Sequence, residues 1–145
     1  MRKLDNEGII ESPEYPQNYP TELTCKWVIL GPTGSTVSLE FESFSLEESK
    51  ECDTYDYVTL KQRCTGKTIS TTNLGDRTEG YCGKLKPPAI NTTCNELHIT
   101  FNSDDSDTET GFRAKYKINK DSGKMEWKSC ALGSRKTLKI VLLCM

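Results

Sequence analysis

Apolar and polar residues alternate along several short stretches of this chain, and each stretch predicts a β-strand. Val37, Leu39 and Phe41 alternate with polar neighbours, which is the period-two pattern of a strand that buries one face. Similar patterns occur at about residues 25–30, 57–60, 96–101 and 112–118. No stretch before residue 119 shows convincing helical periodicity. Many short strands separated by turn signals predict an all-β fold, an antiparallel sandwich of two sheets.

A change in composition near residues 119–123 predicts a domain boundary. Residues 1–118 carry 19 acidic and 13 basic side chains, whereas residues 119–145 carry 2 acidic and 6 basic ones. We therefore expect one domain over residues 1–118. Residues 119–145 would be a linker, the start of another module, a disordered tail or non-native read-through. The acidic body has no basic stripe to neutralise phosphates, which argues against nucleic-acid binding.

Seven cysteines are many for a chain of 145 residues. None forms a C-x-x-C pair and His98 is the only histidine, so a structural zinc site is disfavoured. Widely spaced cysteines in a strand-rich chain suit disulfides and an oxidising compartment. The odd count leaves at least one thiol over, and spacing alone leaves the pairing open.

The chain shows neither a secretory leader nor a membrane span. Residues 1–7 contain no apolar core of the kind that a leader needs. The apolar run at residues 140–143 is far too short to cross a bilayer, so no membrane insertion is expected. If the protein is secreted, we expect this chain to be a fragment, a processed piece or an incomplete gene model.

Three acidic residues, Glu47, Asp56 and Asp104, each lie beside a predicted strand. Folding can bring them to one end of the sheet pair, where the carboxylates would repel one another unless a cation lies between them. A hard divalent ion with oxygen ligands, Ca²⁺, accounts for such a cluster. An EF-hand does not, because counting from Asp105 puts Thr110 where the loop requires glycine.

The order of the short motifs resembles that of a CUB domain. The matching residues are Gly8-x-Ile10, Ser12-Pro13-x-Tyr15-Pro16, Tyr19-Pro20, Cys25-x-Trp27, Leu39-x-Phe41, Phe44-x-Leu46-Glu47, Cys52, Tyr55-Asp56-Tyr57, Tyr81-Cys82-Gly83, Asn95-x-Leu97, Phe101-x-Ser103-Asp104-x-Ser106 and Gly111-Phe112-x-Ala114-x-Tyr116. The resemblance implies a jelly-roll-like sandwich of two antiparallel sheets. An immunoglobulin domain fits poorly, because its core tryptophan should lie well beyond the first cysteine, and here Trp27 follows Cys25 by two positions.

The resemblance also implies a Cys52–Cys82 disulfide. In the family, the cysteine that matches Cys25 bonds to one near the start of the domain. No cysteine stands there in this sequence, so we expect Cys25 to lack its usual partner and the N-terminal edge of the domain to be truncated. Cys64 and Cys94 are additions to the family pattern, and we expect a bridge between them.

The calcium-binding branch of the family implies a ligand set and a mode of partner binding. The implied metal ligands are Glu47, Asp56, Asp104 and Ser106, with main-chain carbonyls nearby. In that branch Ca²⁺ orders the edge loops, and the acidic residues accept a lysine from a protein partner. Tyr15 or Tyr19 could support this contact through its hydroxyl.

One departure from the family pattern concerns the spacing before Asp56. Three residues separate it from Cys52, where the family more often has two. A one-residue bulge would absorb the difference, or else Asp53 or Glu48 would compete as a ligand.

The sequence predicts a binding module that is not an enzyme. His98 alone builds neither a serine-protease triad nor an H-E-x-x-H metal site. Asn91 begins an N-glycosylation sequon. The leading hypothesis is therefore a secreted CUB module that binds Ca²⁺ and an extracellular protein. The alternatives are the non-catalytic part of a larger secreted serine or astacin-like metalloprotease, and a lone CUB protein of the carbohydrate-binding or seminal-plasma type.

Overall fold

The structure, a computed structural model, describes residues 6–64, 70–73, 80–120 and 139–145. Its strands are β1 (Glu7–Glu11), β2 (Thr24–Leu30), β3 (Thr36–Ser45), β4 (Tyr57–Cys64), β5 (Ser70–Asn73), β6 (Ile90–Asn91), β7 (Glu96–Asn102), β8 (Gly111–Asn119) and β9 (Lys139–Cys144). The predicted strands are confirmed as β2, β3, β4, β7 and β8, each longer than its predicted range by one to five residues. In the described part of the chain, no helix has the length and apolar character needed to cross a membrane.

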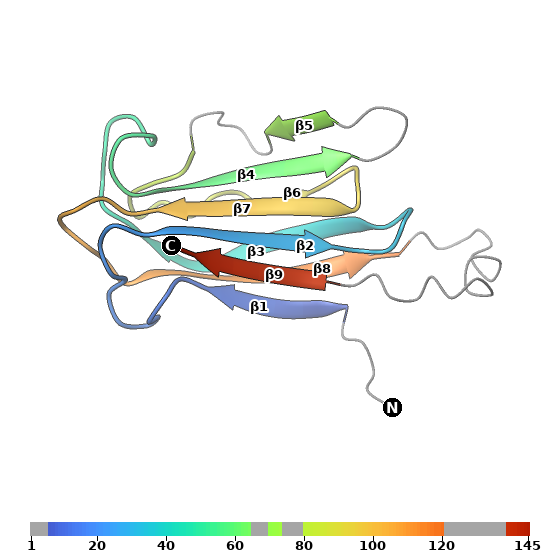
Figure 1. The fold of residues 1–145 in the computed structure, drawn as a ribbon, viewed down its shortest axis with the longest axis horizontal. Helices are drawn as coiled ribbons and strands as arrows, with labels where there is room; N and C mark the ends of the chain where they lie inside the picture. The colour runs from blue at the N-terminus through green and yellow to red at the C-terminus, as the bar shows by residue number, and fades with distance from the viewer. Residues whose placement is uncertain (1–5, 65–69, 74–79, 121–138) are drawn as a thin grey trace.

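The strands form two sheets that pack face to face (Figure 1). One sheet has the order β1-β8-β3-β6 and the other the order β5-β4-β7-β2-β9. Every strand pair is antiparallel. This arrangement confirms the predicted all-β antiparallel two-sheet sandwich.

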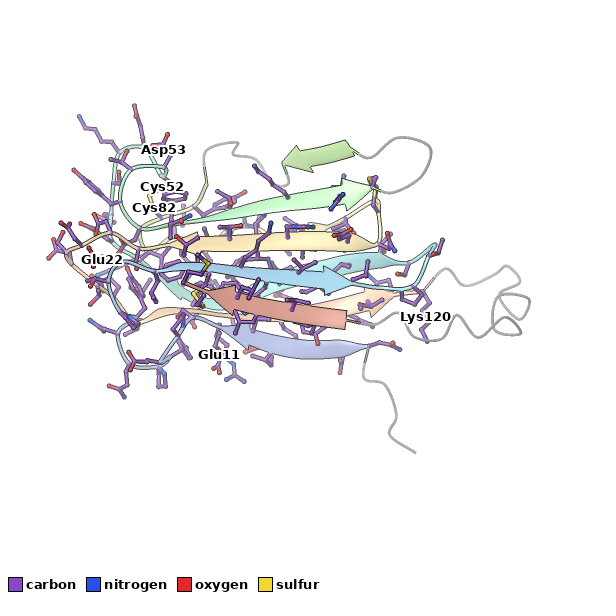
Figure 2. The ribbon with its side chains drawn as sticks, in the orientation of Figure 1. Glu11, Glu22, Cys52, Asp53, Cys82 and Lys120 are labelled. Carbon is purple, nitrogen blue, oxygen red and sulfur yellow. A yellow bond between two sulfur atoms is a disulfide. The ribbon has the colours of Figure 1, made fainter. Side chains whose placement is uncertain are left out.

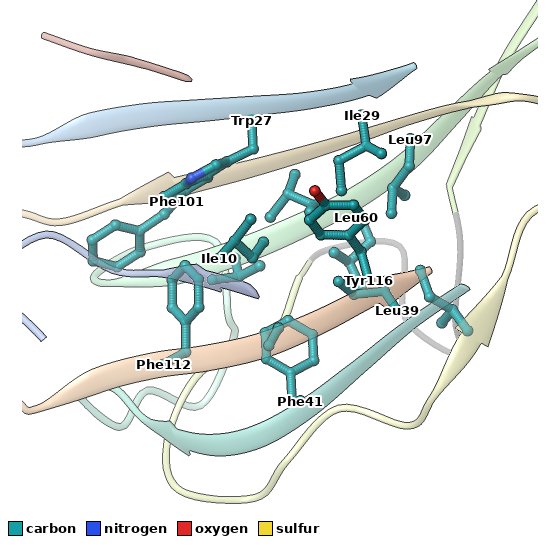
Figure 3. Close-up of a cluster of buried hydrophobic side chains, with 14 of the residues drawn as sticks. Ile10, Trp27, Ile29, Leu39, Phe41, Leu60, Leu97, Phe101, Phe112 and Tyr116 are labelled. Carbon is teal, nitrogen blue, oxygen red and sulfur yellow. The ribbon is translucent and has the colours of Figure 1, made fainter. Parts of the chain in front are cut away.

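The core lies between the sheets because each strand turns alternate side chains inward. In β2, Trp27 and Ile29 are buried while Lys26 is exposed. Figure 3 shows Trp27 and Phe101 facing Phe112 from the opposite sheet. The ring of Phe112 meets those of Trp27 and Phe101 edge-on, at centroid distances of 5.5 and 5.6 Å, a geometry that aromatic quadrupoles favour.

Three disulfides join cysteines of the described residues. Cys52 bonds to Cys82, the bridge that the resemblance implies, and Cys64 bonds to Cys94, the added bridge that we expected. Both join segments that the sandwich brings together. The third bridge joins Cys25 to Cys144, so Cys25, whose usual family partner is missing from this sequence, bonds to a cysteine near the other end of the chain.

Strand β9 is the main departure from the sequence-based expectation. It pairs along its whole length with β2, from Cys25↔Cys144 to Leu30↔Lys139, and Figure 1 shows it beside β2 at the edge of the five-stranded sheet. Part of the segment assigned to a linker, module start or tail is therefore a strand of this sandwich. Residues 121–138, which include Cys130, lie outside the described residues, and the domain boundary at residue 118 stays a prediction.

Candidate metal centre

Three segments meet at one end of the sandwich and bring their carboxylates together. Glu47 follows β3, Asp56 directly precedes β4, and Asp104 follows β7. Strands β4 and β7 pair with Tyr57 opposite Asn102, which brings Asp56 and Asp104 close, while Glu47 arrives from the other sheet. One carboxylate oxygen from each of the three residues lies within 4.8 Å of the others. Figure 1 shows the three loops at the same end of the molecule.

Asp56 is fully buried, and both of its oxygens accept hydrogen bonds. The hydroxyl of Tyr19 donates to Oδ2 at 2.6 Å, and the backbone N–H of Asp104 donates to Oδ1 at 2.8 Å. A buried carboxylate is costly unless such donors surround it. These two bonds therefore hold Asp56 in one orientation and tie the loop after β7 to it.

Tyr19 links the two sheets at this end. Its hydroxyl donates to Asp56 and accepts the backbone N–H of Glu47 at 3.2 Å. Its ring is 1% exposed and packs edge-on against Phe101 at 4.9 Å. Gly111, with φ of 89°, passes close to the ring in a left-handed conformation that suits glycine. Because the ring is buried, Tyr19 positions the site rather than presenting itself to a partner.

Glu47 carries the one unsatisfied buried atom among the side chains that the structure describes. Its Oε2 is shielded from solvent and has no hydrogen-bond partner. Burial raises the pKa of Glu47 from 4.5 to about 6, and the charges of Asp104 and then Asp56 add to the rise, with further contributions from Asp107 and Asp105. A carboxylate with neither partner nor solvent is a position where a bound cation would be favourable.

The pKa shifts of the neighbouring groups also indicate that a bound cation would be favourable at this end. Burial raises the pKa of Asp56 above its ordinary value of 3.8, although the hydrogen bonds from Tyr19 and Asp104 act in the opposite direction. Burial, followed by the bond to Asp56, raises the pKa of the Tyr19 hydroxyl as well. The cluster therefore holds more negative charge than its own donors offset.

The donor set fits a calcium ion. All three side chains offer carboxylate oxygens, which hard divalent cations prefer, and there is no nitrogen or sulfur ligand in the group. Ca²⁺ takes six to eight oxygens, so the three carboxylates would be completed by main-chain carbonyls, hydroxyls or water. The unpartnered Oε2 of Glu47 is the structural observation that supports this fit.

The structure also places the other predicted site residues. Ser106 is exposed, and its backbone N–H donates to Asp104 Oδ1 at 3.1 Å, so it adjoins the cluster. Tyr15 bonds through its hydroxyl to Ser43 at 2.6 Å. The roles of Ser106 as a ligand and of Tyr15 at a partner surface stay predictions.

Neither suggested competitor is a member of the cluster. The group that comes together contains Asp56 and not Asp53 or Glu48, which are both exposed. Figure 2 shows Asp53 next to Cys52 and Cys82 at the tip, with Glu22 at the same end and Lys120 at the opposite end. Asp56 therefore belongs to the cluster with three residues between it and Cys52.

Sequence reasoning missed two features of this end. One is the hydrogen bond between Tyr19 and Asp56, and the other is the burial of Glu47 Oε2 without a hydrogen-bond partner. The only sequence signal for the first was a tyrosine in the loop after Pro16, because the contact spans 37 residues.

The fold and the site define a disulfide-linked β-sandwich with a carboxylate cluster at one end. The chain belongs to the CUB domain family, whose family model matches residues 2–116. It is 34% identical over 135 residues to cubilin of Sus scrofa and 36% identical over 112 residues to zinc metalloproteinase nas-39 of Caenorhabditis elegans. These alignments cover 92% and 77% of this chain, but only 4% and 12% of those proteins.

Solved structures show the same fold. The MASP-1 CUB2 domain bound to Ca²⁺ superposes with a TM-score of 0.63 at 31% identity, over 78% of this chain and 93% of that one. The full extracellular region of zebrafish Gpr126/Adgrg6 gives a TM-score of 0.64 at 34% identity, over 81% of this chain and 14% of that one. A CUB domain similar to this chain therefore holds Ca²⁺.

Proposed function

We propose that this chain is an extracellular CUB module that binds one Ca²⁺ ion and uses the calcium-ordered acidic edge to bind a protein partner. The observation that carries the proposal is the buried, unpartnered Oε2 of Glu47 beside Asp56 and Asp104. The ligands would be Glu47, Asp56, Asp104 and Ser106. The Ca²⁺-bound MASP-1 CUB2 domain supports the choice of ion.

The chain's own residues would prepare this site before the ion binds. Tyr19 and the backbone of Asp104 fix the Asp56 carboxylate, so little side-chain freedom is lost on binding. The ion would supply positive charge that offsets the mutual repulsion of the carboxylates. In turn it would restrain the loops at 46–56 and 103–110, which are the segments that carry Glu47, Asp56 and Asp104.

The partner contact follows from charge. Asp105, Asp107 and Glu109 follow Asp104 in the same segment, so the edge would remain negative after one divalent ion is bound. A lysine of the partner would meet this edge at the carboxylates of Glu47 and Asp104, with Tyr15 as support, while the buried side chains of Asp56 and Tyr19 would hold the edge in place from inside. An ammonium group alone discriminates poorly between partners, so the segments 42–56 and 102–111, which contain these loops and the strand ends beside them, would set specificity.

An extracellular location fits the three disulfides, which persist in oxidising compartments. The sequon asparagine Asn91 is exposed, in the short strand β6, and would be open to glycosylation there. We infer that the chain acts by binding rather than by catalysis.

A second candidate is the non-catalytic CUB portion of a larger secreted protease. It is favoured by the similarity to a protein named as a zinc metalloproteinase, of which this chain spans 12%. The full transcript distinguishes the two candidates, because a protease domain is either encoded beside these residues or not.

Calorimetric titration with Ca²⁺ tests the metal site. We expect one site per chain, and a loss of affinity of about tenfold or more in Asp104→Ala, since a carboxylate ligand is removed. Asp53→Ala is the matched control, because it removes an exposed aspartate at the same end and should leave the affinity unchanged. Equal affinity in Asp104→Ala and the parent chain would reject the assignment.

A pair of peptides tests the partner contact. A lysine-containing peptide and its acetyl-lysine counterpart differ only in the ammonium charge. We expect the first to bind more tightly, in Ca²⁺ and not in chelator. Equal binding of the two peptides would remove the lysine contact and leave the metal site standing.

A further inference from the structure

Strand β9 is an apolar edge strand, and in the described part of the chain no strand pairs with the side of it that faces away from β2. It stands last in its sheet, with β2 on one side. The exposed fractions of Ile140, Val141, Leu142 and Leu143 lie between 38% and 61%. Natural edge strands are usually short, charged or covered, because an open edge pairs with other strands. An apolar run of this kind at an edge marks an interaction surface.

The pairing of β9 with β2 determines which of its backbone groups are free. Met145 and Thr24 donate to each other's carbonyl oxygens, so they form a hydrogen-bonded pair, and such pairs alternate along an antiparallel ladder. Leu143 and Val141 therefore also turn their N–H and C=O groups toward β2. The residues whose groups point away from β2 are Ile140, Leu142 and Cys144. The free edge thus offers donors and acceptors with the spacing that another antiparallel strand requires.

We propose that this edge pairs with β9 of a second copy of the chain, antiparallel, about a two-fold axis at Leu142. Leu142 then lies opposite Leu142 of the second copy, and Ile140 lies opposite Cys144. All the free backbone groups of both strands are paired in this register. Val141 lies opposite Leu143, at the closer spacing of a non-hydrogen-bonded pair. The two five-stranded sheets become one continuous sheet.

A second copy suits this edge because the edge is self-complementary. The side chains of residues 140–145 carry no charge, so the two-fold axis brings no like charges together, and every cross-strand pair of exposed side chains is apolar. A symmetric contact of this kind needs only one surface patch, used twice. The proposed register is the one that pairs all the free backbone groups of the two strands. The exposed side chains that meet across the contact, on both faces of the sheet, are apolar.

The small exposed apolar area of β9 limits the affinity of the dimer. The exposed parts of the side chains of residues 140–143 amount to roughly 200 Å² per copy, taking about 100 Å² as the area that transfer energies assign to an apolar side chain. A standard stable interface buries about 800 Å² per partner. We therefore expect a weak dimer that forms at high protein concentration and dissociates on dilution.

The pairing does not depend on the proposed function, but its consequence for the number of partners bound does. Met145 pairs with Thr24 at the same end of the sandwich as Glu47, Asp56 and Asp104. An antiparallel pair of β9 strands therefore directs the two acidic ends away from each other. Such a dimer would bind two partner molecules on opposite sides.

Analytical ultracentrifugation over a range of concentrations, in chelator, tests the pairing apart from the calcium site. Cys130→Ser is used as the background, so that the seventh cysteine forms no intermolecular bridge. Leu142→Pro removes an N–H on the free edge and no bond to β2, and Leu142→Lys places two like charges at the axis. Each should weaken the dimer about tenfold or more. Leu85→Lys is the matched control, because Leu85 is 78% exposed and stands in the loop before β6, an edge strand of the other sheet.

The outcomes are distinct. A background chain that stays monomeric at the highest concentrations, or a dimer that Leu142→Pro and Leu142→Lys leave unchanged, would overturn the proposal. Leu142→Cys gives a second readout that does not depend on affinity. Oxidation should yield a covalent dimer joined through position 142 of both copies, and absence of that product from a dimeric sample would overturn the register. Peptide mapping of the Cys25–Cys144 bridge in each variant shows that β9 is still in place.

Discussion

Replacement of Glu47 by glutamine should stabilise the calcium-free protein and weaken calcium binding at the same time. The substitution keeps the shape of the side chain and removes its charge. Glu47 Oε2 has no partner among the described residues, so no hydrogen bond to it is lost. What is lost is the repulsion from Asp104 and Asp56, which contributes to the raised pKa of Glu47.

The magnitude follows from that pKa. Folding raises the pKa of Glu47 from 4.5 to about 6, and each pKa unit corresponds to about 1.4 kcal/mol. Because the pKa is raised, the cost of ionising Glu47 is fully present above pH 6 and is relieved as the pH falls toward 4.5. The upper limit is about 2 kcal/mol at pH 7.5, and solvent screening at a half-buried residue reduces it to about 1 kcal/mol. In Ca²⁺ the order reverses, because a tenfold loss of affinity removes about 1.4 kcal/mol of ligand stabilisation.

Urea unfolding at pH 7.5, in chelator and in excess Ca²⁺, measures both effects. Glu48→Gln is the matched control, since it makes the same change at the next residue, which is exposed, and should shift neither unfolding curve. The reasoning is refuted if Glu47→Gln destabilises the calcium-free protein, or if Ca²⁺ stabilises that variant as much as it stabilises the parent chain.

Three further predictions concern pH, the terminal strand and the glycine beside Tyr19. In chelator, lowering the pH from 7.5 to 5 should stabilise the parent chain by about 1 kcal/mol relative to Glu47→Gln. In Ca²⁺, the stabilisation that the ion provides should decrease as the pH is lowered through 6. Urea unfolding midpoints measure both effects. Cys144→Ser should cost about 2–5 kcal/mol of unfolding free energy by opening the bridge to Cys25, and an unchanged midpoint would mean that β9 does not stabilise the sandwich. Gly111→Ala should cost about 1–3 kcal/mol, because it forces a side chain into a left-handed position against Ser12, and thermal denaturation would detect this.

Much of the fold could be predicted from the sequence, because the inward-facing residues of each strand repeat with period two. Phe41 alternates with polar neighbours and is buried, and so are Trp27, Phe101, Phe112 and Tyr116 in the other predicted strands. The strand prediction was most accurate where one face of a strand is buried and the other is exposed to solvent. The two residues of β6 are too few to show a period, and that strand was not predicted.

The candidate site was predictable only in part. The sequence indicated which carboxylates could meet, because each stands at the end of a strand. It gave no sign that Asp56 would be buried or that the hydroxyl of Tyr19 would hold it, since burial and hydrogen bonding depend on loops from both sheets.

The sequence by itself determined the strands, the composition of the core and the class of ligand that three carboxylates favour, because these depend on residue types and on spacing within short segments. Only the tertiary structure decided the partner of Cys25 and the place of β9, for the bridge joins residues that are 119 positions apart. The apolar run at 140–143 matches either a buried strand or an exposed one, and local pattern cannot distinguish them. Pairing across such a distance depends on which edge the rest of the sandwich leaves open, and that edge exists only once the chain has folded.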